Sequence, residues 1–242
     1  MCIRDSGNAQ GLIKDPPKGD FLPVSVDVDG FNHYWIADLK NGFIHNWWGN
    51  NWEYLSLEGP GSNESADITA MNNQVIISTG SLDEAWNNNF TNKGVNIQNN
   101  AGWINLERDD VNNVADIIST AISPDGKKYF AGSWKDGLIQ IENGVLTEHY
   151  TPDNSTLQSR ANDNLNYVRV GGLAFDNGNN LWVTNSETNE PLSVLTAAGE
   201  WKSFSLAPKV NADKRLRNIV IDLEGNKWIQ SVSYTHLTLP TS

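Results

Sequence analysis

The feature that most constrains this sequence is a unit of four short predicted strands that recurs along the chain. Its clearest copy spans residues 170–206, where apolar runs rich in branched and aromatic residues alternate with turns of Asn, Asp and Gly. This alternation is typical of consecutive antiparallel strands. Four such strands in about 40 residues match the size of one blade of a β-propeller.

The turn and the hydrophobic strand that follows it occur again elsewhere in the chain. Their aromatic positions are spaced at about 46–53 residues, with one interval doubled. The doubled interval contains a degenerate copy, in which Asn72 and Asn73 form the turn. The repeated aromatic residues are Trp35, Tyr129, Trp182 and Trp228.

The repeats predict an all-β fold, a β-propeller fragment of about four blades, each a four-stranded antiparallel meander, plus part of a fifth. No amphipathic helical stretch is longer than about two turns. The partial propeller is expected over residues 23–230. Its blades are placed at residues 23–57, 66–107, 115–151, 168–206 and, incomplete, 217–230.

Both ends of the sequence are expected to be sequencing-adapter scars. Residues 1–6, MCIRDS, and the segment VSYTHLTLPT within residues 231–242 are translations of one transposon-derived adapter in inverted orientation. We therefore exclude both ends from the fold prediction. Residues 7–22 are expected to be a linker or the end of a preceding domain.

Composition excludes several classes of function. Cys2 is the single cysteine and lies in the expected scar, which excludes disulfides and thiolate catalysis. The net charge of −12 repels phosphate backbones, so no nucleic-acid partner is expected. No apolar run has the length of a membrane span. No cofactor is expected.

The loops between strands are where a propeller places its binding residues, and three loop regions are candidates. In the first, Trp47 and Trp48 stand among Asn residues and either stack on sugar rings or close the edge of a blade. In the second, the long insertion at residues 81–100 carries Trp86. A loop of this length is either functional or mobile and solvated.

The third candidate is the basic cluster at residues 209–217, in an otherwise acidic chain. Its side chains either hold an anionic group or are solvated as in an ordinary charged loop. The cluster consists of Lys209, Lys214, Arg215 and Arg217.

No catalytic or metal-binding residues are expected. The histidines outside the scars, His33, His45 and His149, lie on separate blades or strands without metal-ligand spacing. Carboxylate pairs across blades leave glycosidase chemistry open. The aspartates that recur at the blade turns are interpreted as turn formers. These aspartates are Asp29, Asp125, Asp176 and Asp222.

Two segments carry a family resemblance. Residues 132–158 and 170–206, with the wording NSETNEPLSVL and GEWKSF, resemble the PorZ family of the type IX secretion system. The blade core also resembles the two-component-regulator type of propeller repeat that is common in Bacteroidota. The resemblance covers most of residues 94–230 and is looser before residue 80.

The resemblance implies a non-catalytic scaffold or adaptor at the outer-membrane surface or elsewhere in the cell envelope or extracellular space. Proteins of that family act with the sortase PorU, the barrel PorV and PorQ. They support the attachment of anionic lipopolysaccharide to secreted cargo. An acidic chain is an awkward host for an anionic glycolipid, so either the basic cluster contributes or binding lies in another part of the protein.

Two other functions stay open from the sequence. The first is the periplasmic oligosaccharide-sensing propeller of a hybrid two-component regulator, which uses the same repeats. The second is a propeller glycan hydrolase or lyase. The adjoining sequence would separate the sensor from the secretion component. A membrane span followed by a kinase indicates a sensor, and a β-sandwich sorting domain indicates a secretion component.

Overall fold

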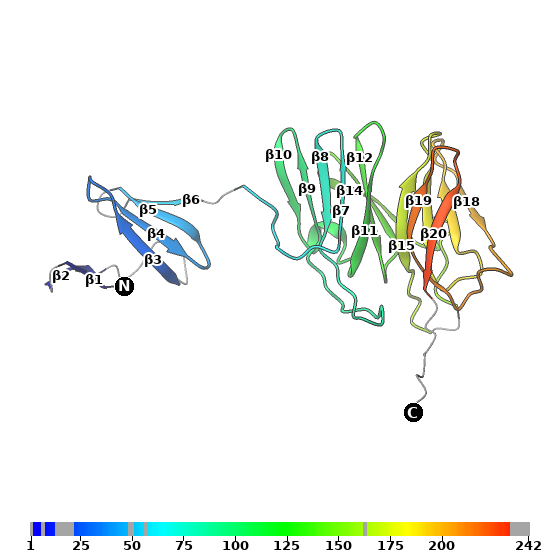
Figure 1. Ribbon diagram of the computed structural model, residues 1–242, viewed down its shortest axis with the longest axis horizontal. Coiled ribbons are helices and arrows are strands. Elements are labelled where there is room, and N and C mark those ends of the chain that lie inside the picture. The colour runs from blue at the N-terminus through cyan, green and yellow to red at the C-terminus, as the bar shows by residue number, and fades with distance from the viewer. Residues whose placement is uncertain are drawn as a thin grey trace, which may run out of the picture. The chain divides into compact units, whose positions relative to one another are not determined.

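A computed structural model of the chain describes residues 2–5, 8–12, 22–47, 51–55, 58–161 and 164–232. The chain divides into two compact units, residues 1–59 and 60–242, which are described separately (Figure 1). No helix in the described ranges is both long and apolar enough to cross a membrane.

The first unit contains a hairpin and one four-stranded sheet. The hairpin pairs β1 (Cys2–Asp5) with β2 (Asn8–Leu12). The assignment of residues 1–6 as an adapter scar and of residues 7–22 as a linker rests on coding sequence and composition. The pairing of β1 with β2 does not test either assignment, and both stay predictions. The sheet has the order β3 (Pro23–Val28), β4 (Tyr34–Asp38), β5 (Gly42–Asn46) and β6 (Trp52–Leu55). Ile36 and Ile44 pair across its centre and are buried.

The second unit contains three four-stranded sheets and one two-stranded sheet among its described residues. The first sheet comprises β7 (Asp67–Met71), β8 (Gln74–Ser78), β9 (Val95–Asn99) and β10 (Gly102–Leu106). The second comprises β11 (Ile117–Ile122), β12 (Lys128–Ser133), β13 (Leu138–Glu142) and β14 (Val145–Tyr150). The third comprises β15 (Val170–Phe175), β16 (Leu181–Asn185), β17 (Leu192–Leu195) and β18 (Trp201–Phe204), and the last comprises β19 (Arg215–Ile221) and β20 (Lys227–Val232).

The predicted fold class is confirmed. Each four-stranded sheet is an antiparallel meander in sequence order, and β19 and β20 supply part of a fifth. A single 3₁₀ turn, Asp109–Val111, is the helical element of the described chain. In the degenerate copy, Asn72 and Asn73 have φ of 52° and 58° and join β7 to β8 as a two-residue turn, as predicted.

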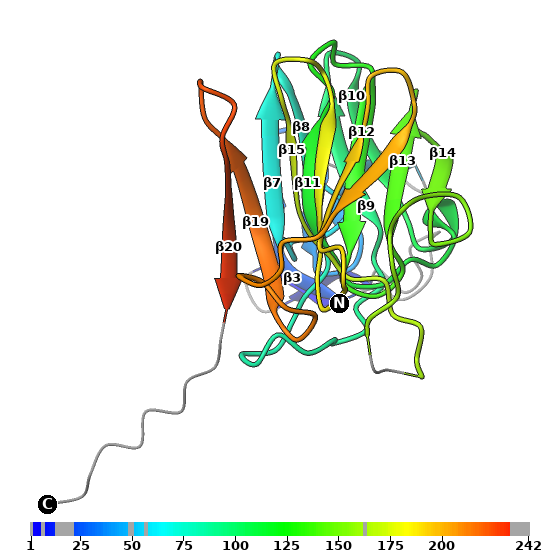
Figure 2. The same ribbon diagram turned by 90° about the vertical axis from the view of Figure 1, so that its right-hand side faces the viewer.

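The sheets of the second unit pack face to face around their first strands. β11 lies beside both β7 and β15, and β15 lies beside β19 (Figure 2). One apolar core lies between the first and second sheets and includes Ile97 and Ile139. Another lies between the second and third sheets and includes Phe130 and Val183. Full burial of one such side chain contributes about 1.5–3 kcal/mol.

The aromatic positions of the repeats coincide at three copies and differ at one. Trp182 pairs across the hairpin with Ala174, and Trp35 and Trp228 occupy the same register in their sheets. The corresponding residue of the second sheet is Phe130, which pairs with Ala121. The expectation that Tyr129 belongs to this set is therefore wrong by one residue.

A longer turn is the physical reason for this shift. The Asp176 N–H donates to the carbonyl four residues later, whereas the Ser123 N–H donates to the carbonyl of Lys128, five residues later. Ser123 thus stands where the other turns have aspartate, and its Oγ accepts the Lys128 N–H at 2.9 Å. Asp125 lies inside the longer turn and is not equivalent to the other repeated aspartates.

Candidate functional site

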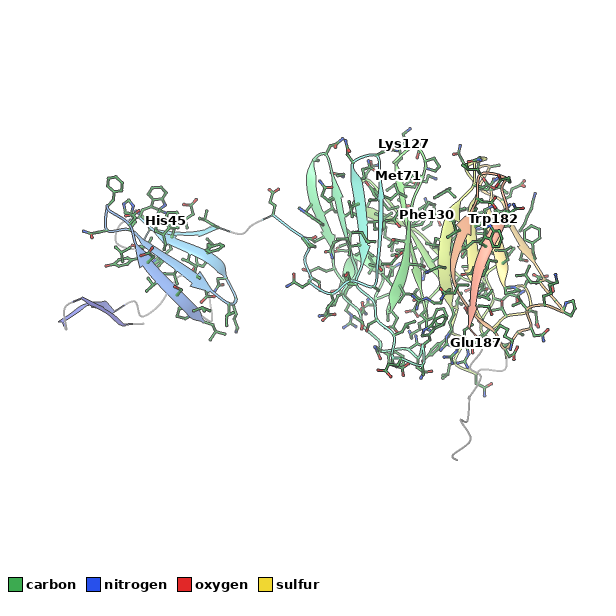
Figure 3. All side chains as sticks on the ribbon, in the orientation of Figure 1. His45, Met71, Lys127, Phe130, Trp182 and Glu187 are labelled. Carbon is green, nitrogen blue, oxygen red and sulfur yellow. The ribbon has the colours of Figure 1, made fainter. Side chains whose placement is uncertain are left out.

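The two ends of the second unit differ in their connections. Tight turns join the strands at the end that carries Met71 and Lys127, and long connections gather at the opposite end around Glu187 (Figure 3). The long segments are residues 79–94, 151–169 and 205–214. Because loops held by a rigid scaffold are the usual place for binding, the Glu187 end is the candidate site.

Glu187 is a buried carboxylate that meets three arginines. The Arg160 Nε lies 3.2 Å from its Oε2 and the Arg215 Nε lies 3.5 Å from its Oε1. Arg169, only 3% exposed, donates from Nη1 to Oε2. Burial lowers the pKa of Arg169, and the charge of Glu187 opposes this effect. Three guanidinium groups thus share the one carboxylate of Glu187.

Two tryptophans extend the site. The Arg169 guanidinium lies 5.2 Å from the ring centroid of Trp134, whose indole N–H donates to the Trp86 carbonyl at 2.9 Å. The Arg217 guanidinium lies 5.0 Å from the centroid of the Trp86 ring. Burial lowers the pKa of Arg217, and Asp67 acts in the opposite direction. We call this set the arginine–tryptophan cluster; it comprises Trp86, Trp134, Arg160, Arg169, Glu187, Arg215 and Arg217.

Carboxylates fix the insertion that carries Trp86. The buried Asp116 accepts the backbone N–H groups of Phe90 and Thr91, at 3.0 and 2.8 Å. Asp83 accepts the N–H groups of Ala85 and Asn87, on either side of Trp86. These bonds hold a positive φ of 58° at Trp86. These contacts order the insertion around Trp86, and its functional role stays a prediction.

The structure joins two candidate regions that the sequence placed 130 residues apart, because the Arg215 Nη1 donates to the carbonyl of Ala85. Trp86, Arg215 and Arg217 therefore lie in one cluster. The carbonyl of Lys214 accepts the Glu187 N–H at 3.0 Å, while the Lys214 Nζ pairs with Asp213. Lys209 is exposed in a turn after β18, where its N–H donates to the Leu206 carbonyl at 3.1 Å.

The tryptophans of the first candidate region belong to the first unit. The Trp47 indole donates to Glu53 at 3.0 Å, and its ring lies 4.3 Å from the ring of His45. Trp48 lies outside the described residues. His33 lies before β4 and His45 lies in β5, so the two are on separate strands as expected, but their ring centroids are 5.5 Å apart.

Sequence reasoning missed four members of the cluster, namely the buried Trp134, Arg169 and Glu187 and the partly exposed Arg160. One signal was present at Arg169, a charge inside the apolar run YVRVGG that leads into β15. A charge at such a position requires a buried partner. Nothing local indicates that the partner is Glu187, which follows β16, two strands further along the chain.

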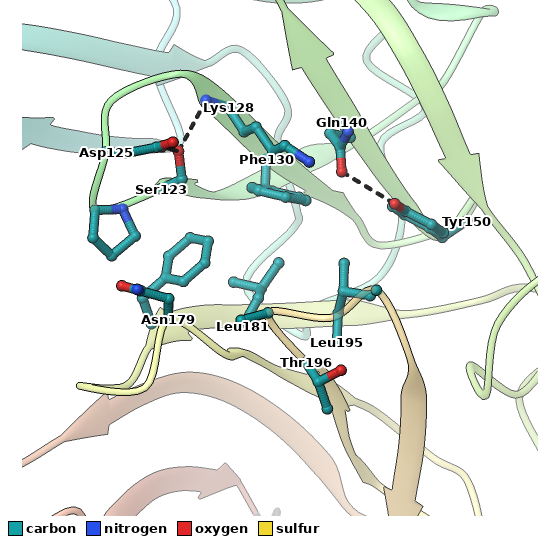
Figure 4. A pocket seen from close by; sticks show the side chains of 14 residues that line it. Ser123, Asp125, Lys128, Phe130, Gln140, Tyr150, Asn179, Leu181, Leu195 and Thr196 are labelled. Carbon is teal, nitrogen blue, oxygen red and sulfur yellow. Dashed lines mark hydrogen bonds between the residues drawn. The ribbon is translucent and has the colours of Figure 1, made fainter.

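A separate hollow of about 310 Å³ opens between the second and third sheets, near the tight turns (Figure 4). Its floor is apolar and includes Phe130 and Leu181. Tyr150 donates its hydroxyl to Gln140 at 3.1 Å, and burial, with Glu148 and Glu142, raises the pKa of Tyr150 to about 12. A hydroxyl with so high a pKa stays protonated, and its one O–H is already donated to Gln140, so Tyr150 is not a base in this hollow.

Comparisons with known proteins identify the fold but no family. No protein-family model matches the chain, and no curated protein matches it. PorZ, an essential surface component of the type IX secretion system of Porphyromonas gingivalis, is similar in structure, with a TM-score of 0.63 at 22% identity. The match covers 86% of this chain and 29% of that chain.

Two further structures are similar at lower scores. One is the extracellular domain assigned to a one-component system, BT4673, of B. thetaiotaomicron, with 17% identity, coverage of 89% and 27%, and a TM-score of 0.44. The other is virginiamycin B lyase of Staphylococcus aureus, with 14% identity, coverage of 86% and 62%, and a TM-score of 0.47. The chain spans less than a third of the PorZ and BT4673 chains. What the PorZ similarity shows is a β-propeller fold.

Proposed function

We propose that this chain is a propeller segment of a PorZ-like surface component of the type IX secretion system, which binds and does not catalyse. In this proposal it acts at the outer-membrane surface with the sortase PorU, PorV and PorQ. It supports the attachment of anionic lipopolysaccharide to secreted cargo. The structural similarity to PorZ and the amino-acid sequence of residues 132–158 and 170–206 support this assignment.

The observation that carries the proposal is the arginine–tryptophan cluster. Guanidinium groups form paired hydrogen bonds with carboxylate and phosphate, and the partly exposed Trp86 offers an aromatic surface to a sugar ring, whereas Trp134 is buried. The cluster places both chemistries at the loop-rich end of an otherwise acidic chain. In this proposal the anionic group binds to the arginines of the cluster rather than to the acidic surface elsewhere.

The same contacts favour binding over catalysis at this site. A general base needs a free lone pair directed at its substrate, whereas Glu187 is engaged by three guanidinium groups. The arginines stay protonated over the physiological range. We therefore expect no hydrolysis or lysis of polysaccharides by the protein, and turnover abolished by a single carboxylate substitution would contradict this.

The glycan part of the proposal is tested with the full chain and two lipopolysaccharides, one anionic and one neutral, in biolayer interferometry. Binding of the anionic form and at least tenfold weaker binding of the neutral form are expected. The double substitution Arg215→Gln and Arg217→Gln should reduce anionic binding at least tenfold. The control Lys127→Gln plus Lys202→Gln removes the same charge from exposed residues outside the cluster and should change binding less than twofold.

The adaptor part is tested separately with purified PorU, PorV and PorQ. Saturable binding of at least one of them at micromolar concentration is expected. Failure of all three to bind would reject the adaptor role, whatever the glycan result. Equal binding of both lipopolysaccharides, or an unchanged affinity of the double arginine variant, would reject the cluster as the anion site.

A further inference from the structure

The first unit contains a compact group of potential metal ligands on the β3–β6 sheet. The ligand atoms of Asp29, His33 and His45 all lie within 4.8 Å of one another. The Asp29 Oδ2 is 3.1 Å from the His33 Nδ1. Two atoms bound to the same zinc ion lie about 3–3.5 Å apart, as follows from bonds of ~2.0–2.1 Å in a tetrahedral site. The Asp29–His33 pair already has that spacing.

His45 supplies an independent observation. Its side chain is 1% exposed, and neither ring nitrogen has a hydrogen-bond partner among the described residues. The Trp35 ring stacks on it at 3.8 Å and Trp47 covers its edge. A buried imidazole without hydrogen bonds costs free energy, and a bound cation removes that cost by using a ring nitrogen as a ligand. Figure 3 shows His45 in the middle of its sheet.

Glu53 completes the surroundings of His45. Its Oε2 lies 3.8 Å from the His45 Nδ1 and is held by the Trp47 indole N–H at 3.0 Å. A histidine that binds a metal commonly donates its other ring N–H to a carboxylate, which fixes the orientation of the ring. Glu53 is placed for that role if His45 binds the ion through Nε2.

The third sheet provides an internal comparison, because it has the same turn without the ligands. Asp176 accepts the Trp182 indole N–H at 2.8 Å, just as Asp29 accepts that of Trp35 at 3.3 Å. The other three positions differ in their chemistry. Where the first unit has His33, His45 and Glu53, the third sheet has Asn180, Val194 and Lys202.

We propose that Asp29, His33 and His45 bind one divalent transition-metal ion of the zinc class. Two imidazoles and a carboxylate are ligands suited to Zn²⁺, and three protein ligands leave a further position for water or another ligand. The ion ties the β3–β4 turn to β5 within one sheet. This inference is independent of the proposed adaptor function, so either can fail without the other.

The test is Zn²⁺ binding by the full chain carrying Cys2→Ser, which removes the single thiol as a competing ligand. Isothermal titration with Zn²⁺ alone should give one site per chain with micromolar or tighter affinity. His33→Asn and His45→Val should each weaken binding at least tenfold. Both install the residues of the third sheet, so the sheet is expected to accept them. His149→Asn, in the other unit, is the matched control and should leave affinity unchanged.

X-ray absorption of the zinc-loaded chain provides a readout that needs no variant. A first shell of nitrogen and oxygen with two imidazoles is expected. Absence of a stoichiometric site, fewer than two imidazoles, or an affinity equal in the His33, His45 and His149 variants would overturn the proposal. Circular dichroism of each metal-free variant separates loss of ligand from loss of fold.

Discussion

At the scale of single residues, an aspartate and a tryptophan six positions later form the recurrent contact of the repeats. Asp222 accepts the Trp228 indole N–H at 2.8 Å and the Asn226 backbone N–H at 2.8 Å. The bonds from Trp228 and Asn226 lower the pKa of Asp222 to about 2. Each such aspartate both closes its turn and holds the tryptophan of the next strand, which explains why the two residue types recur together.

Trp182→Phe should destabilise the protein by about 1.5–3 kcal/mol at pH 7, because it removes a hydrogen bond to the ionised Asp176. Urea unfolding followed by circular dichroism measures the change. Trp201→Phe is the matched control, since the buried Trp201 indole N–H has no hydrogen-bond partner among the described residues. Trp201→Phe should lower the free energy of unfolding by less than half as much as Trp182→Phe. Equal costs would show that ring volume, not the bond to Asp176, decides.

The effect of Trp182→Phe should depend on pH. Burial raises the pKa of Asp176, but the bonds from Trp182 and Asn180 outweigh it and lower the pKa below its ordinary value. A carboxylate with a depressed pKa stabilises the fold above its unfolded pKa of about 3.9, and that stabilisation is lost as the pH falls through the folded pKa. The difference in free energy of unfolding between wild type and Trp182→Phe should therefore have its full value at pH 7 and be smaller at pH 3. An unchanged difference at pH 3 would contradict this account.

At the scale of elements, neighbouring sheets approach most closely at their first strands. A Cβ on Gly171 would lie 2.1 Å from the carbonyl oxygen of Leu216, so β15 and β19 can meet there only if residue 171 has no side chain. Ser186, directly after β16, ties that strand to β19, because its Oγ donates to the Leu216 carbonyl at 2.6 Å and accepts the Leu216 N–H at 2.7 Å. Close backbone contact and buried polar bonds together fix the spacing of the sheets.

Gly171→Ala should destabilise the protein by about 1–3 kcal/mol, because the added methyl group forces β15 and β19 apart. The midpoint of urea unfolding is the measurement. Gly30→Ala is the control, since a Cβ at Gly30 meets nothing within 4 Å. A midpoint for Gly171→Ala that matches the Gly30→Ala midpoint would show that the strands move apart without cost.

At the scale of the whole molecule, contacts distant in sequence create the arginine–tryptophan cluster. Arg169 precedes β15, Glu187 follows β16 and Arg215 begins β19, so the cluster exists only when successive sheets are packed side by side. Its ion pairs also report that packing, because removing the shared carboxylate leaves three guanidinium groups without their counter-charge.

Glu187→Gln should destabilise the protein by about 3–5 kcal/mol, the usual cost of breaking a buried ion pair by removing one partner. Chemical denaturation at neutral pH measures it. Glu142→Gln makes the same change in a partly exposed pair with Lys128, 3.3 Å apart, and should cost less than about 1 kcal/mol. If the two variants lose equal stability, the cluster is held by packing and not by the charge of Glu187.

On acidification the protein should precipitate at a higher pH than the pH at which it unfolds. The net charge of −12 disappears as carboxylates protonate, and a chain near zero net charge associates. The aspartates of the turns stay ionised to lower pH, with pKa values of about 2 for Asp29 and Asp222. Turbidity should therefore rise during titration below pH 5 while circular dichroism of the remaining soluble protein stays native. Loss of the native spectrum before turbidity would contradict this order.

Local patterns in the sequence determined the elements of this protein. Alternating apolar residues and Asn, Asp and Gly turns specify strands that pair with their immediate neighbours, so the meanders and the Asn72–Asn73 turn were predictable. The sequence predicted Tyr129 where the structure has Phe130. The turn after Ser123 has one extra residue, which shifts the register of the next strand without changing the composition of the turn. Candidates such as Trp86 and Arg217 were identified singly, from loop length and charge.

Tertiary structure alone decided which candidates meet. The pairing of Arg217 with Trp86, of Arg169 with Glu187 and of His33 with His45 depends on how strands and sheets pack. Packing is set by side-chain volume and by close backbone approach across sheets, neither of which has a period along the chain. Residues that lie far apart in sequence therefore carry no local mark of the site that they form together.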